Sequence, residues 1–333
     1  MFDWPEFIQA MTTRYVAFGL ELRASFPLPG MVSDRAEELP SLELELTTSG
    51  ALERTWSGAN GPPEWRGRLG DGLDLVIERG AAGDLLFSYG DHPPSRGVRA
   101  RFLLDAGKQR LDCAPTQSNL DWQRALVSKV LSSISMMRGY EALHAGAVDS
   151  PGGVIAIMAP SGSGKSTLAI ELLRRGWPLF ADDVLTLDRA EDAVRAHPGT
   201  PHMNLAESLP SDVDPQTLGT TLGILSGERW LAAHTTTKHP RPVRLLCLLE
   251  RGPSLPLEIH TLPSNPLLLA PYMLGLSTDT ERYRSRFSLY ADLMESTTLA
   301  RLTAGFEHRP EQLADLIEQA LMREPELVAG GIT

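Results

Sequence analysis

The chain has 333 residues, more than one hydrophobic core usually organises, so we expect two domains. Hydrophobic residues make up 42% of it and charged residues 22%, which is typical of a globular protein. The net charge of −11 argues against a nucleic-acid partner, because phosphate backbones are held by clustered lysine and arginine. We expect no membrane partner either, since no stretch approaches the ~20 uninterrupted apolar residues of a membrane span.

Two further features favour a cytoplasmic location. Residues 1–6 lack the basic and apolar regions with which a secretory signal begins. The chain holds only two cysteines, Cys113 and Cys247, each within an apolar stretch. Two buried free thiols are favoured over a single disulfide, which stays the alternative. Because the cysteines and histidines are not clustered, a structural zinc site is not expected.

The first third of the chain has the pattern of strands. Residues 41–46 alternate between leucine and polar side chains, the period of a half-buried strand. Further strands are predicted at residues 73–77, 84–89 and 98–104, separated by breaks rich in glycine and proline. We therefore predict a small antiparallel sheet in a β-rich N-terminal domain over residues 1–118.

A helical segment follows. It begins at Asp121, and apolar residues then recur at three- and four-residue spacing as far as Met137, which gives one apolar face. We predict a connecting helix over residues 119–143, between the N-terminal domain and the rest of the chain.

From His144 onward, predicted strands alternate with predicted helices. Strands are predicted at residues 154–158, 178–187 and 243–249, and helices at 168–173, 287–294 and 313–321. The first helix is expected to end at Gly176, and Pro310 marks the start of the last. Strand–loop–helix–strand order predicts an α/β domain over residues 144–333 with a mostly parallel central sheet.

A glycine-rich loop lies between the first of these strands and its helix. It consists of Ser161, Gly162, Ser163, Gly164, Lys165, Ser166 and Thr167. The glycines let successive N–H groups turn inward toward a phosphate, and the helix adds its positive N-terminal end. In such a Walker A loop the lysine neutralises the β- and γ-phosphates and the next hydroxyl binds Mg²⁺. One position departs from the pattern, because Ala159 stands where the first glycine is usual.

Paired acids follow in the next predicted strand, at Asp182 and Asp183. Two buried carboxylates are costly unless each has a metal or hydrogen-bond partner. Neighbouring residues of a strand face opposite ways, so we expect different roles. One accepts the proton of an attacking hydroxyl and the other supports Mg²⁺. The alternative is a single metal-binding carboxylate next to a capping aspartate.

Other polar residues stay open to two interpretations. On spacing alone, a satisfied core histidine is favoured for His144 over a functional one. Arg195, His197 and His202 suit either the phosphate site or an ordinary loop. For Lys238, Arg241 and Arg244, a solvated loop face is favoured over stabilisation of transferred charge.

Residues 144–187, with their LHAGAV, APSGSGKST and LFADDVLTL elements, resemble the catalytic core of the HPr kinase/phosphorylase family. The chain is more similar to the divergent HPr-kinase-like proteins of bacteria. Some of these phosphorylate a serine of a ribosomally made peptide, such as a lasso peptide precursor. The resemblance implies a P-loop kinase fold for the α/β domain, with ATP and Mg²⁺ as cofactors.

The resemblance also implies residue roles. Lys165 corresponds to the phosphate lysine, while Ser166 and Asp183 correspond to the metal ligands. Asp182 corresponds to the general base on the acceptor hydroxyl, and His144 to the residue that orients it.

The function expected from these observations is transfer of the γ-phosphoryl group of ATP to a hydroxyl, serine being favoured, of a peptide or protein. Two alternatives remain: a small-molecule kinase, and a nucleotide-gated regulatory ATPase that has no phosphoryl acceptor. The acid pair beside the loop favours transfer. The sequence leaves the oligomeric state open, with a homo-oligomer as one alternative.

Overall fold

The structure, a computed structural model, describes residues 12–34, 39–68, 72–91, 97–117, 119–190, 193–207, 209, 213–275 and 280–327. Residues 1–6, from which the absence of a secretory signal was inferred, lie outside this part. The chain divides into two compact units. The first comprises Met1–Gly139, His202–Leu209 and Thr221–Ala232, and the second comprises Tyr140–Pro201, Pro210–Thr220 and Ala233–Thr333.

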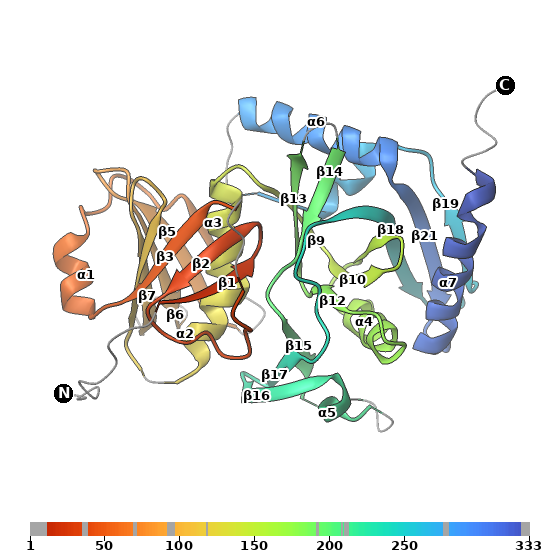
Figure 1. Cartoon of the computed structure of the whole chain (residues 1–333), viewed down its shortest axis with the longest axis horizontal. Coiled ribbons are helices and arrows are strands. Elements are labelled where there is room, and N and C mark those ends of the chain that lie inside the picture. Colours follow the sequence, from red (N-terminus) through yellow and green to blue (C-terminus); the bar gives the residue numbers. More distant parts are fainter. Residues whose placement is uncertain are drawn as a thin grey trace. The chain divides into compact units, whose positions relative to one another are not determined.

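The first unit contains an eight-stranded sheet with the order β1-β2-β3-β8-β7-β6-β5-β4 (Figure 1). Its strands are β1 (Thr13–Ala17), β2 (Leu20–Ala24), β3 (Ser41–Leu46), β4 (Trp65–Arg68), β5 (Asp74–Arg79), β6 (Leu85–Gly90), β7 (Val98–Leu104) and β8 (Arg110–Pro115). The four strands predicted from the sequence are thereby confirmed. The sheet is mixed rather than antiparallel, because β3 runs parallel to both β2 and β8. Alternation along one strand carries no information about the direction of its neighbours, so the sequence could not reveal this.

The predicted helical stretch is present and belongs to the first unit, but it ends at Met137 rather than at residue 143, because residues 141–144 form a strand. It consists of α2 (Asp121–Ala125), a π-helical turn η2 (Leu126–Val130) and α3 (Leu131–Met137). Its recurring apolar residues are buried as far as Ile134, as their spacing predicted, and Met137 is half-buried. A separate short helix, α1 (Ser49–Thr55), precedes β4.

A small three-stranded sheet has the order β15-β17-β16. Its strands are β15 (His202–Ala206), β16 (Gly219–Leu225) and β17 (Glu228–Ala233), and most of their residues belong to the first unit.

The second unit is built on a ten-stranded sheet. Eight strands follow the order β12-β10-β11-β18-β14-β13-β9-β20, and β21 pairs with β18 and with β19. The strands are β9 (Glu141–His144), β10 (Gly146–Ser150), β11 (Gly153–Met158), β12 (Leu179–Ala181), β13 (Val184–Ala190), β14 (Ala193–His197), β18 (Arg241–Gly252), β19 (Glu258–Thr261), β20 (Met273–Leu274) and β21 (Thr298–Gly305).

The prediction of a mostly parallel central sheet is wrong. Within the described residues, β18 runs parallel to β11 and to β21, and the other strand pairs are antiparallel. Tight hairpins join β10 to β11 and β13 to β14, and a hairpin forces its two strands to be antiparallel. Long connections that contain helices separate β11 from β18 and β18 from β21. The domain is therefore α/β in composition but has a mixed sheet.

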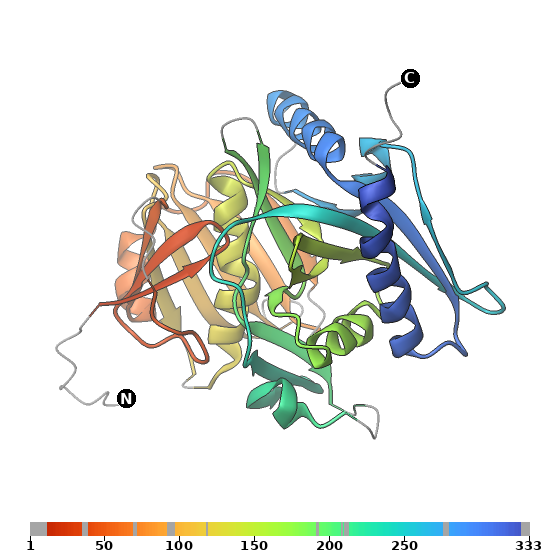
Figure 2. The ribbon, with the colours of Figure 1, turned by 45° about the vertical axis from the view of Figure 1, so that its right-hand side comes forward.

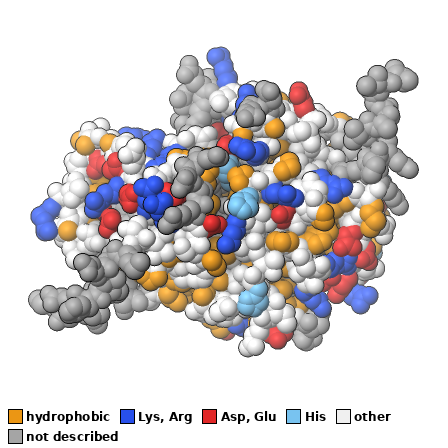
Figure 3. All heavy atoms as spheres, viewed as in Figure 1, with side chains coloured by type: hydrophobic (Ala, Val, Ile, Leu, Met, Phe, Trp, Pro, Cys, Tyr) orange, Lys and Arg blue, Asp and Glu red, His pale blue; other side chains and the backbone are white. Residues whose placement is uncertain are grey.

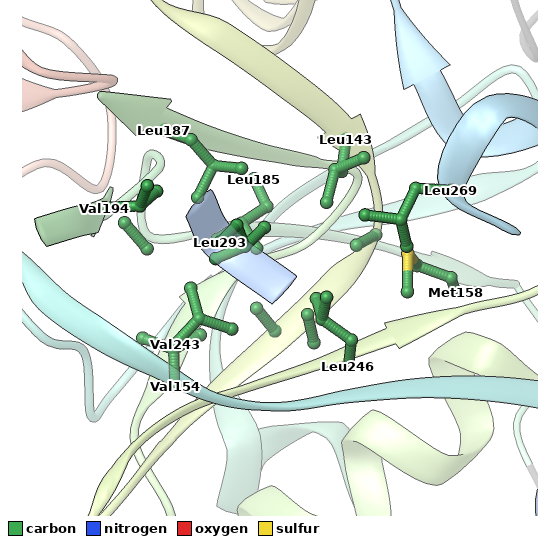
Figure 4. Packing of buried hydrophobic residues seen from close by; sticks show 14 of the residues in the cluster. Leu143, Val154, Met158, Leu185, Leu187, Val194, Val243, Leu246, Leu269 and Leu293 are labelled. Atoms are coloured by element: carbon green, nitrogen blue, oxygen red, sulfur yellow. The ribbon is translucent and has the colours of Figure 1, made fainter. Parts of the chain in front are cut away.

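Helices cover both faces of this sheet. On one face, α4 (Lys165–Arg174) and α7 (Pro310–Leu327) share a buried apolar cluster with β11, β18 and β21, and the two helices lie side by side (Figure 2). On the other face, α6 (Thr280–Ser296) packs on a second cluster. Figure 4 shows Leu293 of α6 among Leu185, Leu143 and Val243 of the strands. The remaining short helices are α5 (Pro215–Leu218) and η3 (Pro266–Tyr272).

Both cysteines are free and buried, one in each unit, which confirms the expected pair of thiols. Burial raises the pKa of Cys247 to about 12, so this thiol is a packing group rather than a nucleophile. In the described parts of the chain, no helix combines the length and the apolar character needed to cross a bilayer.

One histidine of the first unit makes stability depend on pH. His202 is buried, its ring lies 4.9 Å from that of Trp230, and its Nε2 lies 2.6 Å from the carbonyl oxygen of Pro29. Burial lowers the pKa of His202 from 6.5 to about 4. The unfolded chain therefore binds a proton between these two pH values that the folded chain does not. Stability from this residue is complete above pH 6.5 and is lost as the pH falls toward 4.

We predict that His202→Gln flattens the pH dependence of stability. Between pH 6.5 and 4, the free energy of unfolding of the wild type is expected to fall by about 3 kcal/mol more than that of the variant. Urea unfolding at a series of pH values measures the difference. His260→Gln, at an exposed position, is the matched control. Equal slopes for wild type and His202→Gln would contradict the prediction.

Candidate functional site

The glycine loop connects β11, the fully buried strand Gly153–Met158, to the ten-residue helix α4. Gly164 caps the helix with φ 88° and ψ 15°, a left-handed conformation that glycine adopts without strain. The amide of Ser163 donates to the carbonyl of Pro160, and that of Leu168 donates to the carbonyl of Gly164. Because the first amides of a helix have no partner within the helix, the loop presents donors and a positive dipole end to an anion.

Ala159, which replaces the usual first glycine, is fully buried. Its methyl group belongs to the apolar cluster that contains Leu168 and Leu172 of α4. The additional carbon thus packs behind the loop, where the cluster accommodates it.

The decisive contact at the loop joins Lys165 to the acid pair. The Lys165 Nζ donates to Oδ1 of Asp183 at 3.0 Å. Only 8% of Lys165 is exposed, whereas the side chain of Asp183 is 36% exposed. The pair of acids predicted from the sequence therefore lies at the glycine loop, and its Asp183 carboxylate faces the loop lysine.

Asp182 and Asp183 lie in a break between strands, which corrects the prediction of one strand over residues 178–187. β12 ends before Asp182 and pairs with β10, whereas β13 begins after Asp183 and pairs with β9. The opposite chain is interrupted at Ala145, whose amide donates to the carbonyl of Asp183. The acids are consequently outside the regular ladder, and the rule that neighbouring side chains face opposite ways does not apply to them.

His144 is the last residue of β9 and is half-buried. Its Nδ1 lies 3.1 Å from the main-chain carbonyl oxygen of Asp183. A protonated Nδ1 donates to this carbonyl, which leaves Nε2 as the acceptor of the neutral ring. The ring of His144 therefore lies at the main chain of the acid pair. Orientation of the Asp182 carboxylate by His144 stays a prediction.

Sequence reasoning missed one glycine of the site. A methyl group added at Gly146 would lie 3.1 Å from the carbonyl oxygen of Asp182 and 3.5 Å from Cγ of Lys165. Gly146 therefore lets the lysine stem and the acid-pair main chain approach β10 closely. Its position directly after His144 and Ala145 was the feature of the sequence that could have identified Gly146 as a site residue.

Two ion-pair groups hold the supporting elements in place. Arg175, at the end of α4, pairs with Glu171 of the same helix and with Asp315 and Glu318 of α7. Figure 3 shows acidic and basic side chains together over α7. On the opposite face of the sheet, Glu141 of β9 forms a buried pair with Arg286.

Other candidate residues lie elsewhere. His197 is buried on β14, with Nε2 2.9 Å from Oδ1 of Asp188 and an edge-on contact to Tyr140, which is a core environment. His202 is a buried residue of the first unit. Arg241 and Arg244 lie at the start of β18, where Arg241 pairs with Asp149 and Arg244 donates to a carbonyl of α7.

The start of β18 lies at the end of the sheet opposite to the loop. β18 runs parallel to β11, with Val243 beside Val154 and Leu248 beside Met158. The glycine loop follows Met158, so residues beyond Leu248 share its edge. Arg251 is such a residue. Its place beside the loop depends on this strand pairing, so the sequence alone did not mark Arg251 as a site residue.

The donor set at the loop suits a metal ion that is shared with a ligand. Within the described ranges, no three His, Cys, Asp or Glu residues gather in a metal-binding group. Mg²⁺ needs no such group, because it binds through one or two carboxylates together with phosphate oxygens and water. The half-exposed Asp183 carboxylate and the Ser166 hydroxyl in the first turn of α4 fit this arrangement.

No family model matches the chain, and none of the curated proteins matches it. Among solved structures, it is similar to the Hpr(Ser) kinase/phosphatase from Coxiella burnetii, with 15% sequence identity and a TM-score of 0.32. The similarity covers 56% of this chain and 94% of that one. A likeness of this size carries no argument about activity, so the functional argument depends on the site itself.

We predict that the buried pair between Glu141 and Arg286 anchors the strand that bears His144. Arg286 Nε donates to Glu141 Oε2 at 2.6 Å, and both side chains are at most 7% exposed. Arg286→Met leaves the carboxylate buried without this cation, so the free energy of unfolding is expected to fall by about 3–5 kcal/mol. Urea unfolding measures the loss.

The control for this prediction is Arg189→Met. Arg189 pairs with Asp292 of the same helix α6, but both side chains are more than 40% exposed. An exposed pair contributes about 0–1 kcal/mol. Equal effects of Arg189→Met and Arg286→Met would show that the buried pair has no special role.

Proposed function

We propose that the second unit is a P-loop phosphotransferase. It transfers the γ-phosphoryl group of ATP, with Mg²⁺, to a hydroxyl of a peptide or protein, serine being the favoured acceptor. The observation that carries the proposal is the 3.0 Å contact between Lys165 of the glycine loop and Asp183 of the acid pair. This contact supports a single site that combines a phosphate cradle with two carboxylates, which is what phosphoryl transfer to a hydroxyl requires.

Each residue of the site has a separate role in the proposed transfer. The loop amides and the start of α4 hold the phosphate chain, and Lys165 neutralises its β- and γ-phosphates. Ser166 and Asp183 hold Mg²⁺, which when bound neutralises charge on the β- and γ-phosphate oxygens. Asp182 is the general base, and His144 positions the acid pair through the carbonyl of Asp183.

The transfer forms one bond to the γ-phosphorus and breaks another. The acceptor hydroxyl gives its proton to the Asp182 carboxylate, and its oxygen forms a bond to the γ-phosphorus. The bond from this phosphorus to the oxygen that bridges the β- and γ-phosphates breaks, and ADP leaves with that oxygen. Asp182 then returns the proton to water. The half-buried position of Asp182, outside the sheet ladder, suits a base that must reach an incoming ligand.

The acceptor is tested with γ-labelled ATP, Mg²⁺ and serine-containing peptides encoded beside the gene. We predict label on a peptide serine with the wild type, and no label with Lys165→Ala. The Asp183 partner of Lys165 is one-third exposed, so the variant is expected to unfold within a few degrees of the wild type. Release of free phosphate without labelled peptide would instead favour the nucleotide-gated ATPase.

The assignment of the base is tested by Asp182→Asn. We predict that transfer slows by a factor of about 10²–10⁴, because the amide accepts no proton from the hydroxyl. The dissociation constant for ATP is expected to stay within a few-fold of the wild-type value. Asp292→Asn, in the exposed pair with Arg189 on α6, controls for loss of a carboxylate. A full transfer rate with Asp182→Asn would assign the base to another residue.

A further inference from the structure

Arg251 lies at the same edge of the sheet as the glycine loop. It is the second-last residue of β18, and β18 runs parallel to β11, the strand that leads into the loop. Its side chain reaches the loop, because a methyl group added at Gly164 would lie 3.7 Å from Nη1 of Arg251. The guanidinium therefore faces the loop residue that caps α4.

One part of this guanidinium is tethered. Its Nη2 donates to the carbonyl oxygen of Gly305 at 2.9 Å and to that of His308 at 3.1 Å. Gly305 is the last residue of β21, and His308 lies in the connection between β21 and α7. The tether fixes the side chain at the loop, so little rotational freedom is lost when another group binds to it.

The two carbonyls bind only Nη2, so the guanidinium keeps N–H donors that they do not use. Its Nε is buried and has no hydrogen-bond partner within the part of the chain that the structure describes. In the same part, no carboxylate pairs with Arg251. A half-buried guanidinium whose charge meets only neutral carbonyls is costly, and an anion at the glycine loop would offset that cost.

We propose that Arg251 is a second cationic ligand of the phosphate site. It donates from Nη1, the nitrogen that lies near Gly164, to the phosphate chain of the nucleotide, alongside Lys165. This inference rests on the proposed function, because it takes a nucleoside triphosphate as the anion at the loop. The sequence had raised a role at the phosphate site for Lys238, Arg241 and Arg244, although it favoured a solvated loop face for these three residues.

The experiment compares binding of ATP, ADP, AMP and adenosine, each by isothermal titration with Mg²⁺ present, to the wild type and to Arg251→Gln. Charge-assisted hydrogen bonds predict that Arg251→Gln weakens ATP binding roughly 10- to 100-fold. The loss is expected to decrease from ATP to AMP and to be absent for adenosine. Arg244→Gln is the matched control. It removes an arginine from the same strand that also donates to a main-chain carbonyl, but at the opposite end of the sheet.

A purely structural role predicts a different result. If Arg251 only tethers the connection before α7, Arg251→Gln lowers the unfolding temperature but leaves the ratio of ATP to adenosine affinity unchanged. That ratio, measured on folded protein, overturns the inference if it stays at the wild-type value.

Arg251→Lys decides the question where Arg251→Gln does not fold. The lysine keeps the positive charge but lacks the fork that serves two carbonyls and a phosphate together. We expect an intermediate loss of ATP affinity, about 3- to 10-fold, with adenosine unaffected. Unchanged ATP affinity in this variant also overturns the inference.

Measurements on the wild type distinguish a failure of this inference from a failure of the proposed function. Failure of the wild type to bind ATP would refute the proposed function itself. Wild-type binding and transfer, together with unaltered ATP affinity in the Arg251 variants, would refute the role of Arg251 alone.

Discussion

The candidate site depends on a break in the ladder between two antiparallel segments. β9 pairs with β13 over residues 141–144 and 184–187, and β10 pairs with β12 at Ala147 and Val148. Ala145, Asp182 and Asp183 lie between these two ladders, where the amide of Ala145 still donates to the carbonyl of Asp183. Had the ladder continued, the two acids would have been fixed on opposite faces of a sheet. The interruption instead lets the Asp183 carboxylate meet Lys165, while its carbonyl meets the ring of His144. One irregularity of the main chain thus brings together three residues that are distant in sequence.

The sequence predicted what local chemistry determines. A buried strand, the glycine-rich turn and the helix that follows depend on neighbouring residues, and each is present where the pattern placed it. The break at the acid pair was missed because β12 and β13 are both buried, so residues 178–187 resemble one apolar strand. Only the change of partner, from β10 to β9, creates the break, and pairing between distant segments leaves no periodic signal.

The same reason explains why Arg251 was not found from the sequence. Lys238, Arg241 and Arg244 form an obvious basic cluster in the sequence, but the parallel pairing of β18 with β11 carries Arg241 and Arg244 away from the loop. A single arginine at the other end of this strand is inconspicuous until the pairing is known. The strand directions of the predicted sheet were wrong for a related reason. A hairpin and a crossover differ in the segment that connects two strands, whereas the strands themselves have the same sequence pattern.

The contact between Lys165 and Asp183 also has a consequence for how ligands bind. Under the proposed function, a phosphate at the loop competes with Asp183 for the lysine, and a metal ion competes with the lysine for Asp183. Each ligand weakens the contact that the other must displace, so nucleotide and metal favour one another's binding. Because Asp183 is one-third exposed, the ion pair contributes only about 0–1 kcal/mol, and ligands of ordinary affinity can displace it. A weak pair at this place keeps the lysine and the carboxylate aligned without preventing their use.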